Sequence, residues 1–351
     1  MTSPKAAPEQ KIRDHYPEEI FPIPGLEKYE NIKYKIVNIV IIGYLSKLID
    51  LHWLCQVFPI MEIENFVKKT KKMSIPYYGY EDRAVSCIFG DTSRGIRKIA
   101  KPLKNIMYLD YQFYGKNQHM KISKDNIHIT GIRSENSGQV CIRKVLEKIR
   151  RIENLIQTAR ALSLPDKEFI MHCINCAVPI EQFVNCPEAT ESSINVYEFL
   201  MVNADSRREA SPSKFFEFIQ EVLCGTRTIC EGDIDVQKFT VHNKVFYIDM
   251  NYNINLRKLN RLAHKNGHNV IFYNILDVQN TILEIKNLET GEIYACLKIQ
   301  KSGGVNFWCG PEPDKSFQAF RIALPFIEKC FTTPCSSKRV HVRKTPRGRI
   351  E

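Results

Sequence analysis

The chain has 351 residues, of which 44% are hydrophobic and 25% are charged, and its formal net charge is +11. These fractions are ordinary for a globular protein, and no apolar run is long enough to span a bilayer. The positive charge favours an anionic partner, most simply nucleic acid, against the alternative of a merely basic protein.

Cysteine usage and the first residues bear on the compartment. Twelve cysteines occur without the framework of a small disulfide scaffold. The first twenty residues are charged and contain prolines, so they lack the apolar core of a secretory signal. We therefore expect a reducing intracellular compartment, with most thiols buried as small hydrophobic groups.

The first part of the chain predicts one folded unit behind an arm. Residues 1–30 are rich in proline and predict a flexible arm. Residues 33–43 predict a β-strand, and a helix follows to about Phe58. The basic stretch 62–104 predicts an extended insertion with some strand near 85–89, and each of its basic side chains, including Arg94, is expected to be solvated.

Further strands are predicted near 106–113, 118–123 and 127–130. A long helix follows from about Ser134 to Leu162, because its apolar positions keep helical spacing. Pro165 is expected to end this helix. The first unit thus covers 31–164.

The rest of the chain predicts three segments. Residues 165–237 predict an inserted helical region, and residues 238–332 predict a second unit with the element order of the first. Residues 333–351 form a basic tail that could bind phosphate, act as a nuclear address, or be solvated and disordered.

A duplicated pattern supports this division. The strand at Asn38–Ile42 leads into an amphipathic segment at Ile49–Leu54, and Asn243–Asp249 leads into Ile254–Leu259 in the same way. Each copy is followed downstream by a strand that ends in glycine, at Gly131 and Gly310, and then by a helix. The sequence therefore predicts a tandem duplication.

The first strand of each copy has two apolar faces with one asparagine between them. Side chains alternate along a strand, so Asn38, Val40 and Ile42 share one face and Ile39 and Ile41 share the other. A helix-covered antiparallel sheet normally shows water a polar second face. The inserted region could cover this face. A DNA minor groove is the other candidate, because its A·T pairs offer only acceptors to an asparagine donor.

At this point the motifs resemble a known family. Asn38-Ile39-Val40 leading to Asp50-Leu51, then Thr130 to Glu135, and Ala319-Phe320 followed by Pro325-Phe326-Ile327, are similar to the TATA-box-binding protein family. The resemblance excludes both tails and the middle insertion. It implies an α+β saddle: two pseudo-symmetric repeats of curved antiparallel sheet, with helices on the convex face. Chain length and insertions resemble versions from large DNA viruses.

The resemblance also implies a DNA-binding surface. Asn38 and Asn243 would donate hydrogen bonds to bases, beside apolar contacts from Val40 and Val245. Arg133 would meet a phosphate. Further groove contacts are expected from His128, Thr130, Phe307 and Cys309.

Departures from the family occur where it wedges phenylalanines between base steps. Here the nearest positions are Asn105 and Ile122 in the first repeat, and about Asn280 and Ile299 in the second. Isoleucine can still wedge, whereas asparagine is not expected to, so kinking is expected to be weaker than in the family or displaced to other residues. We also expect the apolar set of strand 106–113 to face DNA and Asp110 to face the helices. A shift of register would place Asp110 against phosphates.

Chemical motifs are scarce. His172, Cys173, Cys176 and Cys186 have the start of a zinc-site spacing without a second clean pair, and buried thiols are the simpler interpretation. No phosphate-binding glycine loop, zinc-protease helix or nucleophile elbow is present. The sequence therefore predicts neither an enzyme nor a cofactor.

Three hypotheses remain. The first is a transcription initiation factor that binds A·T-rich double-stranded DNA as a monomer and helps recruit RNA polymerase and other initiation factors, in a nucleus, a cytoplasmic viral factory or a virion. The second is a protein–protein platform of the same fold without sequence-specific DNA binding. The third is a metal-dependent nucleic-acid enzyme that uses the Cys/His cluster.

Overall fold

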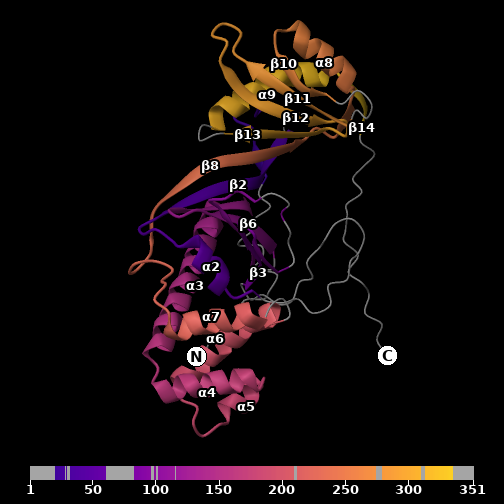
Figure 1. Ribbon diagram of the computed structural model, residues 1–351. Coiled ribbons are helices and arrows are strands. Elements are labelled where there is room, and N and C mark those ends of the chain that lie inside the picture. Colours follow the sequence, from indigo (N-terminus) through magenta and orange to yellow (C-terminus); the bar gives the residue numbers. More distant parts are fainter. Residues whose placement is uncertain are drawn as a thin grey trace, which may run out of the picture. The chain divides into compact units, whose positions relative to one another are not determined.

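The computed structural model describes residues 20–27, 29, 32–60, 83–95, 99, 102–114, 116–208, 212–273, 279–309 and 313–334 (Figure 1). Its contacts divide the chain into two units. Unit 1 takes the described residues within Asn38–His242, and unit 2 those within Glu18–Val37 and Asn243–Glu351. Most of the predicted arm, most of the 62–104 stretch and nearly all of the basic tail lie outside the described residues.

Unit 1 combines an antiparallel sheet with helices. Its strands are β2 (Lys33–Leu45, from Asn38 onward), β3 (Arg83–Phe89), β4 (Thr92–Gly95), β5 (Met107–Phe113), β6 (Lys116–Ile122) and β7 (Asn126–Ile132). They pair in the order β2-β7-β6-β5-β3-β4. Its helices are α2 (Leu51–Val57), α3 (Glu135–Ala161), α4 (Leu164–Asn175), α5 (Ile180–Val184), α6 (Glu191–Arg208) and α7 (Pro212–Cys224).

Unit 2 has a second antiparallel sheet. Its strands are β8 (Val236–Asp249, from Asn243 onward), β10 (Asn269–Tyr273), β11 (Asn280–Lys286), β12 (Ile293–Gln300) and β13 (Gly304–Cys309), in the order β8-β13-β12-β11-β10. Two helices pack on them, α8 (Leu256–Lys265) and α9 (Pro313–Glu328). β1 (Phe21–Pro22) pairs with the start of β2, and β9 (Tyr252–Ile254) pairs with β14 (Phe331–Pro334).

The two sheets share one topology. If the main strands of each unit are numbered along the chain, both sheets have the order 1-5-4-3-2, and unit 1 adds β4 at its edge. In each unit one helix follows strand 1 and another follows strand 5. The helix after strand 1 is capped alike: Asp50 accepts from Trp53 N at 2.9 Å, and Asn255 accepts from Lys258 N at 3.0 Å.

Burial alternates along the strands and assigns the two faces of each sheet. In β7 the side chains of Ile127 and Ile129 are fully buried, whereas His128 and Thr130 are only partly buried. The buried set faces α3, where Ile41 meets the helix at Gly138. We call the face without these helices the second face. In unit 2 it carries the residues that alternate with buried Leu297 and Phe307.

The insertion belongs to unit 1. Helices α6 and α7 pack on α3, and α4 and α5 pack on α6. They therefore lie on the helical side of the sheet, so the described insertion is not the cover for the second face that the sequence allowed. Pro165 lies in the first turn of α4, whose N-cap is Ser163, so it starts a helix directly after α3 has ended.

The described end of the predicted arm is structured. Phe21 and Pro22 pair with β2, and Ile23 is fully buried in the core of unit 2. Arg321 Nη1 donates to Pro24 O at 2.7 Å. These residues are therefore an integral part of unit 2. Among the described residues no helix is long and apolar enough to cross a membrane.

Candidate nucleic-acid interface

The second face of unit 1 is lined by side chains from neighbouring strands. Asn38, Val40 and Ile42 on β2 alternate with Ile39 and Ile41, which are each 1% exposed, although Val40 is itself buried at 9% exposure. On β7 the same face carries His128 and Thr130, and on β6 it carries His119 and Lys121. Thr130 lies opposite His119, and His128 lies opposite both Lys121 and Ile42.

Asn38 is oriented by a bulge in β7. The register of β2 and β7 shifts between Ile39 and Ile41, where β7 contains one extra residue, and Gly131 lies in this bulge with φ of 92°. Gly131 N donates to Asn38 Oδ1 at 2.6 Å. Because a backbone N–H can only donate, the oxygen of the Asn38 amide is engaged and its Nδ2 group remains as a donor.

Strand β5 faces opposite to our expectation. Its apolar residues Met107, Leu109, Tyr111 and Phe113 are buried on the helical side, where Lys148 of α3 lies over the Tyr111 ring. Asp110 is therefore on the second face. It does not present a bare charge there, because its side chain is 5% exposed and His119 Nδ1 lies 2.6 Å from its Oδ1. The shift of register that the sequence left open is the arrangement found.

His128 lies in the middle of this face. Burial lowers its pKa, and the nearby charges of Lys121 and His242 lower it further. The rings of His128 and His242 are 6.5 Å apart. His128 Nε2 is buried and has no hydrogen-bond partner among the described residues. A neutral imidazole with a free nitrogen can donate or accept, so this position is chemically adaptable.

Unit 2 presents a related second face. Asn243, Val245 and Tyr247 alternate along β8 with buried Phe246 and Ile248. Asn243 Oδ1 is buried without a partner among the described residues, and Gly310, its expected neighbour, lies outside them. Trp308 lies opposite Val245 and is 38% exposed. An aromatic ring beside an asparagine and a valine can contact bases or sugars.

Three predicted contacts are buried on the helical side. Ile122, Ile299 and Phe307 are all 0% exposed, so they cannot touch a surface ligand, and we leave them out of the proposed interface. Counting back from each glycine matches Phe307 to His128. However, β13 pairs with β8 without interruption whereas β7 has its bulge, so Asn306 is the counterpart of His128, and the second-face residues of β13 are Asn306 and Trp308. No pattern in the sequence marks that bulge.

The remaining predicted contacts are less informative. Arg133 is partly buried just past the end of β7. Cys309 ends β13, and its side chain lies outside the described residues. At the wedge positions Asn105 is exposed and Asn280 is partly buried.

Comparisons with known proteins find similarity among solved structures. No protein-family model matches the chain, and no curated protein matches it. A solved structure of TBP from Methanococcus jannaschii is similar to it, with 12% sequence identity, coverage of 84% of this chain and 98% of that chain, and a TM-score of 0.37.

The Cys/His cluster of the insertion does not form a metal centre. Among the described residues no group of three or more His, Cys, Asp or Glu could hold a metal ion. His172 Nε2 and Cys176 Sγ are 3.8 Å apart, and burial raises the pKa of Cys173, with Cys186 and Cys176 nearby. Cys173 is buried, Cys186 is partly buried and Cys176 is exposed, so the buried-thiol interpretation applies to Cys173 alone.

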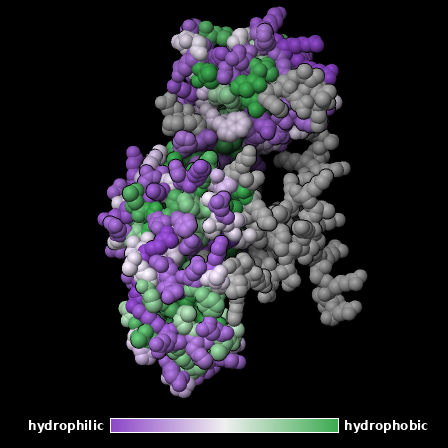
Figure 2. Space-filling view, viewed as in Figure 1, coloured by the Kyte–Doolittle hydropathy of each residue, from purple (hydrophilic) through white to green (hydrophobic). Residues whose placement is uncertain are grey.

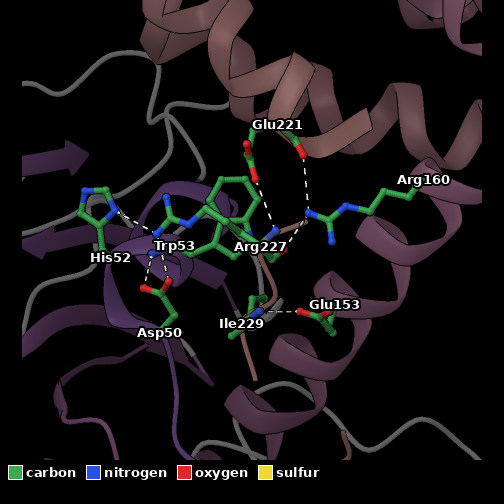
Figure 3. Close-up of polar contacts among 8 residues, drawn as sticks. All are labelled: Asp50, His52, Trp53, Glu153, Arg160, Glu221, Arg227 and Ile229. Atoms are coloured by element: carbon green, nitrogen blue, oxygen red, sulfur yellow. Dashed lines mark hydrogen bonds and ion pairs between the residues drawn. The ribbon is translucent and has the colours of Figure 1, made fainter. Parts of the chain in front are cut away.

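The segment between α7 and β8, which we call the strap, contacts α2 and α3 through Arg227 and Ile229 (Figure 3). Arg227 lies over the Trp53 ring, 5.2 Å from its centroid, and donates to Asp50 Oδ2 at 2.9 Å. Burial by itself would raise the pKa of Asp50, but hydrogen bonds from Trp53 N and Arg227 outweigh it and lower the pKa. Arg160 Nη2 donates to Arg227 O at 2.6 Å, and Ile229 N donates to a carboxylate oxygen of Glu153 at 2.7 Å.

A hollow of about 810 Å³ lies beside this strap. Its lining includes Leu48 and His52, which are exposed, and Cys230, which is buried. A histidine and a cysteine in one hollow raise the question of nucleophilic catalysis. Cys230 is 7% exposed and burial raises its pKa, so its thiol stays protonated and is not an activated nucleophile.

Proposed function

We propose that this protein binds the minor groove of A·T-rich duplex DNA through the second faces of its two sheets, as a non-catalytic transcription initiation factor of the TATA-box-binding type. Its expected partners are promoter DNA, RNA polymerase and further initiation factors. The proposal rests on the residues described above and on the duplicated strand order.

The orientation of Asn38 carries the proposal. The floor of the minor groove at A·T pairs presents only acceptors, adenine N3 and thymine O2. The amide of Asn38 is held by Gly131 N so that a donor is left. Ile42 and Thr130, both partly buried, and buried Val40 share this face, and small or apolar side chains suit close contact with a groove that has no donor at A·T pairs.

The charges of these faces suit a polyanion. Lys121 lies on the second face of unit 1 and Lys298 on that of unit 2, where the Glu284 carboxylate is paired with Lys286 at 3.3 Å. The carboxylate of Asp110 is buried against His119, so it repels phosphates less than an exposed carboxylate would. Because Ile122 and Ile299 are buried, they supply no wedge, and we expect a smaller bend than wedged phenylalanines produce.

The test compares two isosteric changes. Asn38→Asp keeps an oxygen for Gly131 N and replaces the Nδ2 donor with a second acceptor. Asn195→Asp makes the same change on the exposed face of α6. We expect the first to weaken binding to an A·T-rich duplex at least tenfold, since a good base contact is worth about 1–3 kcal/mol, and the second to change it less than about twofold.

Fluorescence anisotropy with labelled A·T-rich and G·C-rich duplexes measures both effects. Thermal unfolding of each variant checks that the fold is intact. Equal affinity for the two duplexes, or an unchanged affinity of the Asn38→Asp variant, would exclude minor-groove recognition through this asparagine.

A protein–protein platform is the second candidate. The observation that favours it is the position of the insertion, which enlarges the helical side of unit 1 without covering its second face. The two functions do not exclude each other, because they use different sides of the sheet.

A further inference from the structure

A small groove lies in unit 1 where α6 of the insertion passes α3, and it has a volume of about 150 Å³. Ile152 and Phe199 form its floor and are 2% and 6% exposed. Pro59, Leu155 and Val202 form its walls. The groove is on the helical side of the sheet, away from the proposed DNA interface.

The groove has the size and polarity of an anchor site. Its volume accommodates one large apolar side chain, and its floor and walls are aliphatic or aromatic. Val202 is 45% exposed, so part of this apolar lining faces water. Burying a leucine or phenylalanine there would contribute about 1.5–3 kcal/mol to binding. Figure 2 shows hydrophobic side chains among hydrophilic ones on the surface of this part of the molecule.

One buried arginine holds two walls of the groove in place. Arg94 Nη1 donates to Phe58 O at 2.8 Å, directly before Pro59. Its Nη2 donates to Asn203 Oδ1 at 2.9 Å, directly after Val202. The groove is therefore built before any ligand arrives, and a preformed site loses less conformational entropy when it binds.

The charges beside the groove are distributed unevenly. Lys144, Lys148 and Arg151 follow one another at helical spacing on α3, and Lys148 and Arg151 line the groove itself. Lys144 and Lys148 lie over the rings of Tyr114 and Tyr111, which orients these two ammonium groups. Glu198 stands on the opposite rim. An acidic side chain is favoured on the α3 side of any bound segment.

We propose that this groove docks an amphipathic segment of a partner protein that inserts one large apolar side chain and places acidic residues against the α3 cations. The charge complementarity selects an acidic partner. The size of the cavity limits the anchor to a single side chain. This surface is independent of DNA binding, so its test does not depend on the proposed function.

The experiment selects ligands without assuming their spacing. A displayed library of random 16-residue peptides is selected on the full chain and counter-selected on the Val202→Asp variant. We expect the enriched peptides to share a leucine, phenylalanine or similar residue flanked by aspartate or glutamate. Synthetic peptides from this set are then titrated against the protein by fluorescence anisotropy.

Two pairs of variants give the controls. Val202→Asp and Arg151→Glu should each weaken binding at least tenfold. Val184→Asp, equally exposed on α5, and Arg257→Glu, on α8 of unit 2, should change it less than twofold. Thermal unfolding verifies that all four variants remain folded.

The outcomes decide the proposal. Acidic, apolar peptides that lose affinity only with the two groove variants support it. It is overturned if no peptide distinguishes the native chain from Val202→Asp, or if the peptides that do so are basic or uncharged. It is also overturned if Arg151→Glu and Arg257→Glu weaken binding equally, because the attraction would then come from overall charge.

Discussion

Arg94 on β4 donates a hydrogen bond from Nη2 to Oδ1 of Asn203 on α6 over 2.9 Å. Its Nη1 also reaches the carbonyl oxygens of Cys55, Gln56 and Phe58, at 3.0, 2.9 and 2.8 Å. These are carbonyls that the end of α2 leaves without helical partners. A single guanidinium thus joins the edge of the sheet, the end of a helix and the insertion.

Arg94→Ala should destabilise unit 1. It would leave buried carbonyls and the Asn203 amide without their donor, and each such group costs about 1–3 kcal/mol, so we expect the free energy of unfolding to fall by about 2–4 kcal/mol. Arg94→Lys should be intermediate, since one ammonium cannot serve all four oxygens. Chemical denaturation measures both. Lys104→Ala, an exposed residue of the same basic stretch, is the control and should change stability by less than about 0.5 kcal/mol.

Local patterns predicted most elements, because helical and strand periods are properties of neighbouring residues. The helix expected from Ser134 to Leu162 is found at Glu135–Ala161 with Ser134 as its N-cap, and the strand expected at 33–43 is found at Lys33–Leu45. Arg94 could not be predicted in this way. Its basic neighbours suggested solvent, and its partners on α6 are more than a hundred residues away.

The faces of the strands were harder to predict than the strands themselves. A period of two indicates which residues share a face but not which face meets the helices. Strand β5 has apolar residues on one side and Asp110 on the other. Asp110 lies opposite His119 because β5 pairs with β6, and this pairing is not visible in the local pattern. The bulge in β7 has no counterpart in β13, so counting from the two glycines shifts the predicted faces of the β13 residues by one position. For Asn38 and Asn243 the period of two was sufficient, because their neighbours Ile39 and Ile41 on β2 and Phe246 and Ile248 on β8 are buried.

Trp308 should report directly on DNA binding. The chain has two tryptophans: Trp53 is fully buried and Trp308 is 38% exposed on the second face of unit 2. A duplex that covers this face should change the emission of Trp308 and protect it from acrylamide quenching. Trp308→Phe should abolish the change and leave the emission of Trp53. If a saturating duplex raises anisotropy without altering the tryptophan emission, DNA does not lie on this face.

Lys33 and Lys35 should contact phosphates. Both lysines lie on one face of β2, and Lys35 Nζ lies 5.4 Å from the centroid of the Tyr247 ring. The intervening Tyr34 packs on Phe246 in the core. Both lysines line a hollow of about 290 Å³ in unit 2. Each phosphate contact contributes about 0.9 to the slope of log K against log salt concentration. Lys33→Gln with Lys35→Gln should therefore reduce the slope by about 1.8.

The matched control for this experiment removes two cations elsewhere in unit 2. Arg257→Gln with Lys265→Gln changes exposed residues of α8, on the helical side of the sheet. This double variant should leave the salt slope nearly unchanged. An equal reduction in both double variants would mean that the slope reflects net charge rather than contacts at the hollow.

Acidification should destabilise the protein through His128. Burial, Lys121 and His242 lower its pKa below that of the unfolded chain, so the unfolded state binds more protons as pH falls past about 6.5. The contribution of neutral His128 to the free energy of unfolding is therefore fully present above that pH, and it is lost as the pH falls from about 6.5 through the folded pKa. His128→Gln should flatten the dependence of the unfolding free energy on pH between about 7 and 5, measured by denaturant titration. It should not abolish it, because burial also lowers the pKa of His268. His172→Gln, exposed on α4, is the control, and an equal flattening there would contradict this assignment.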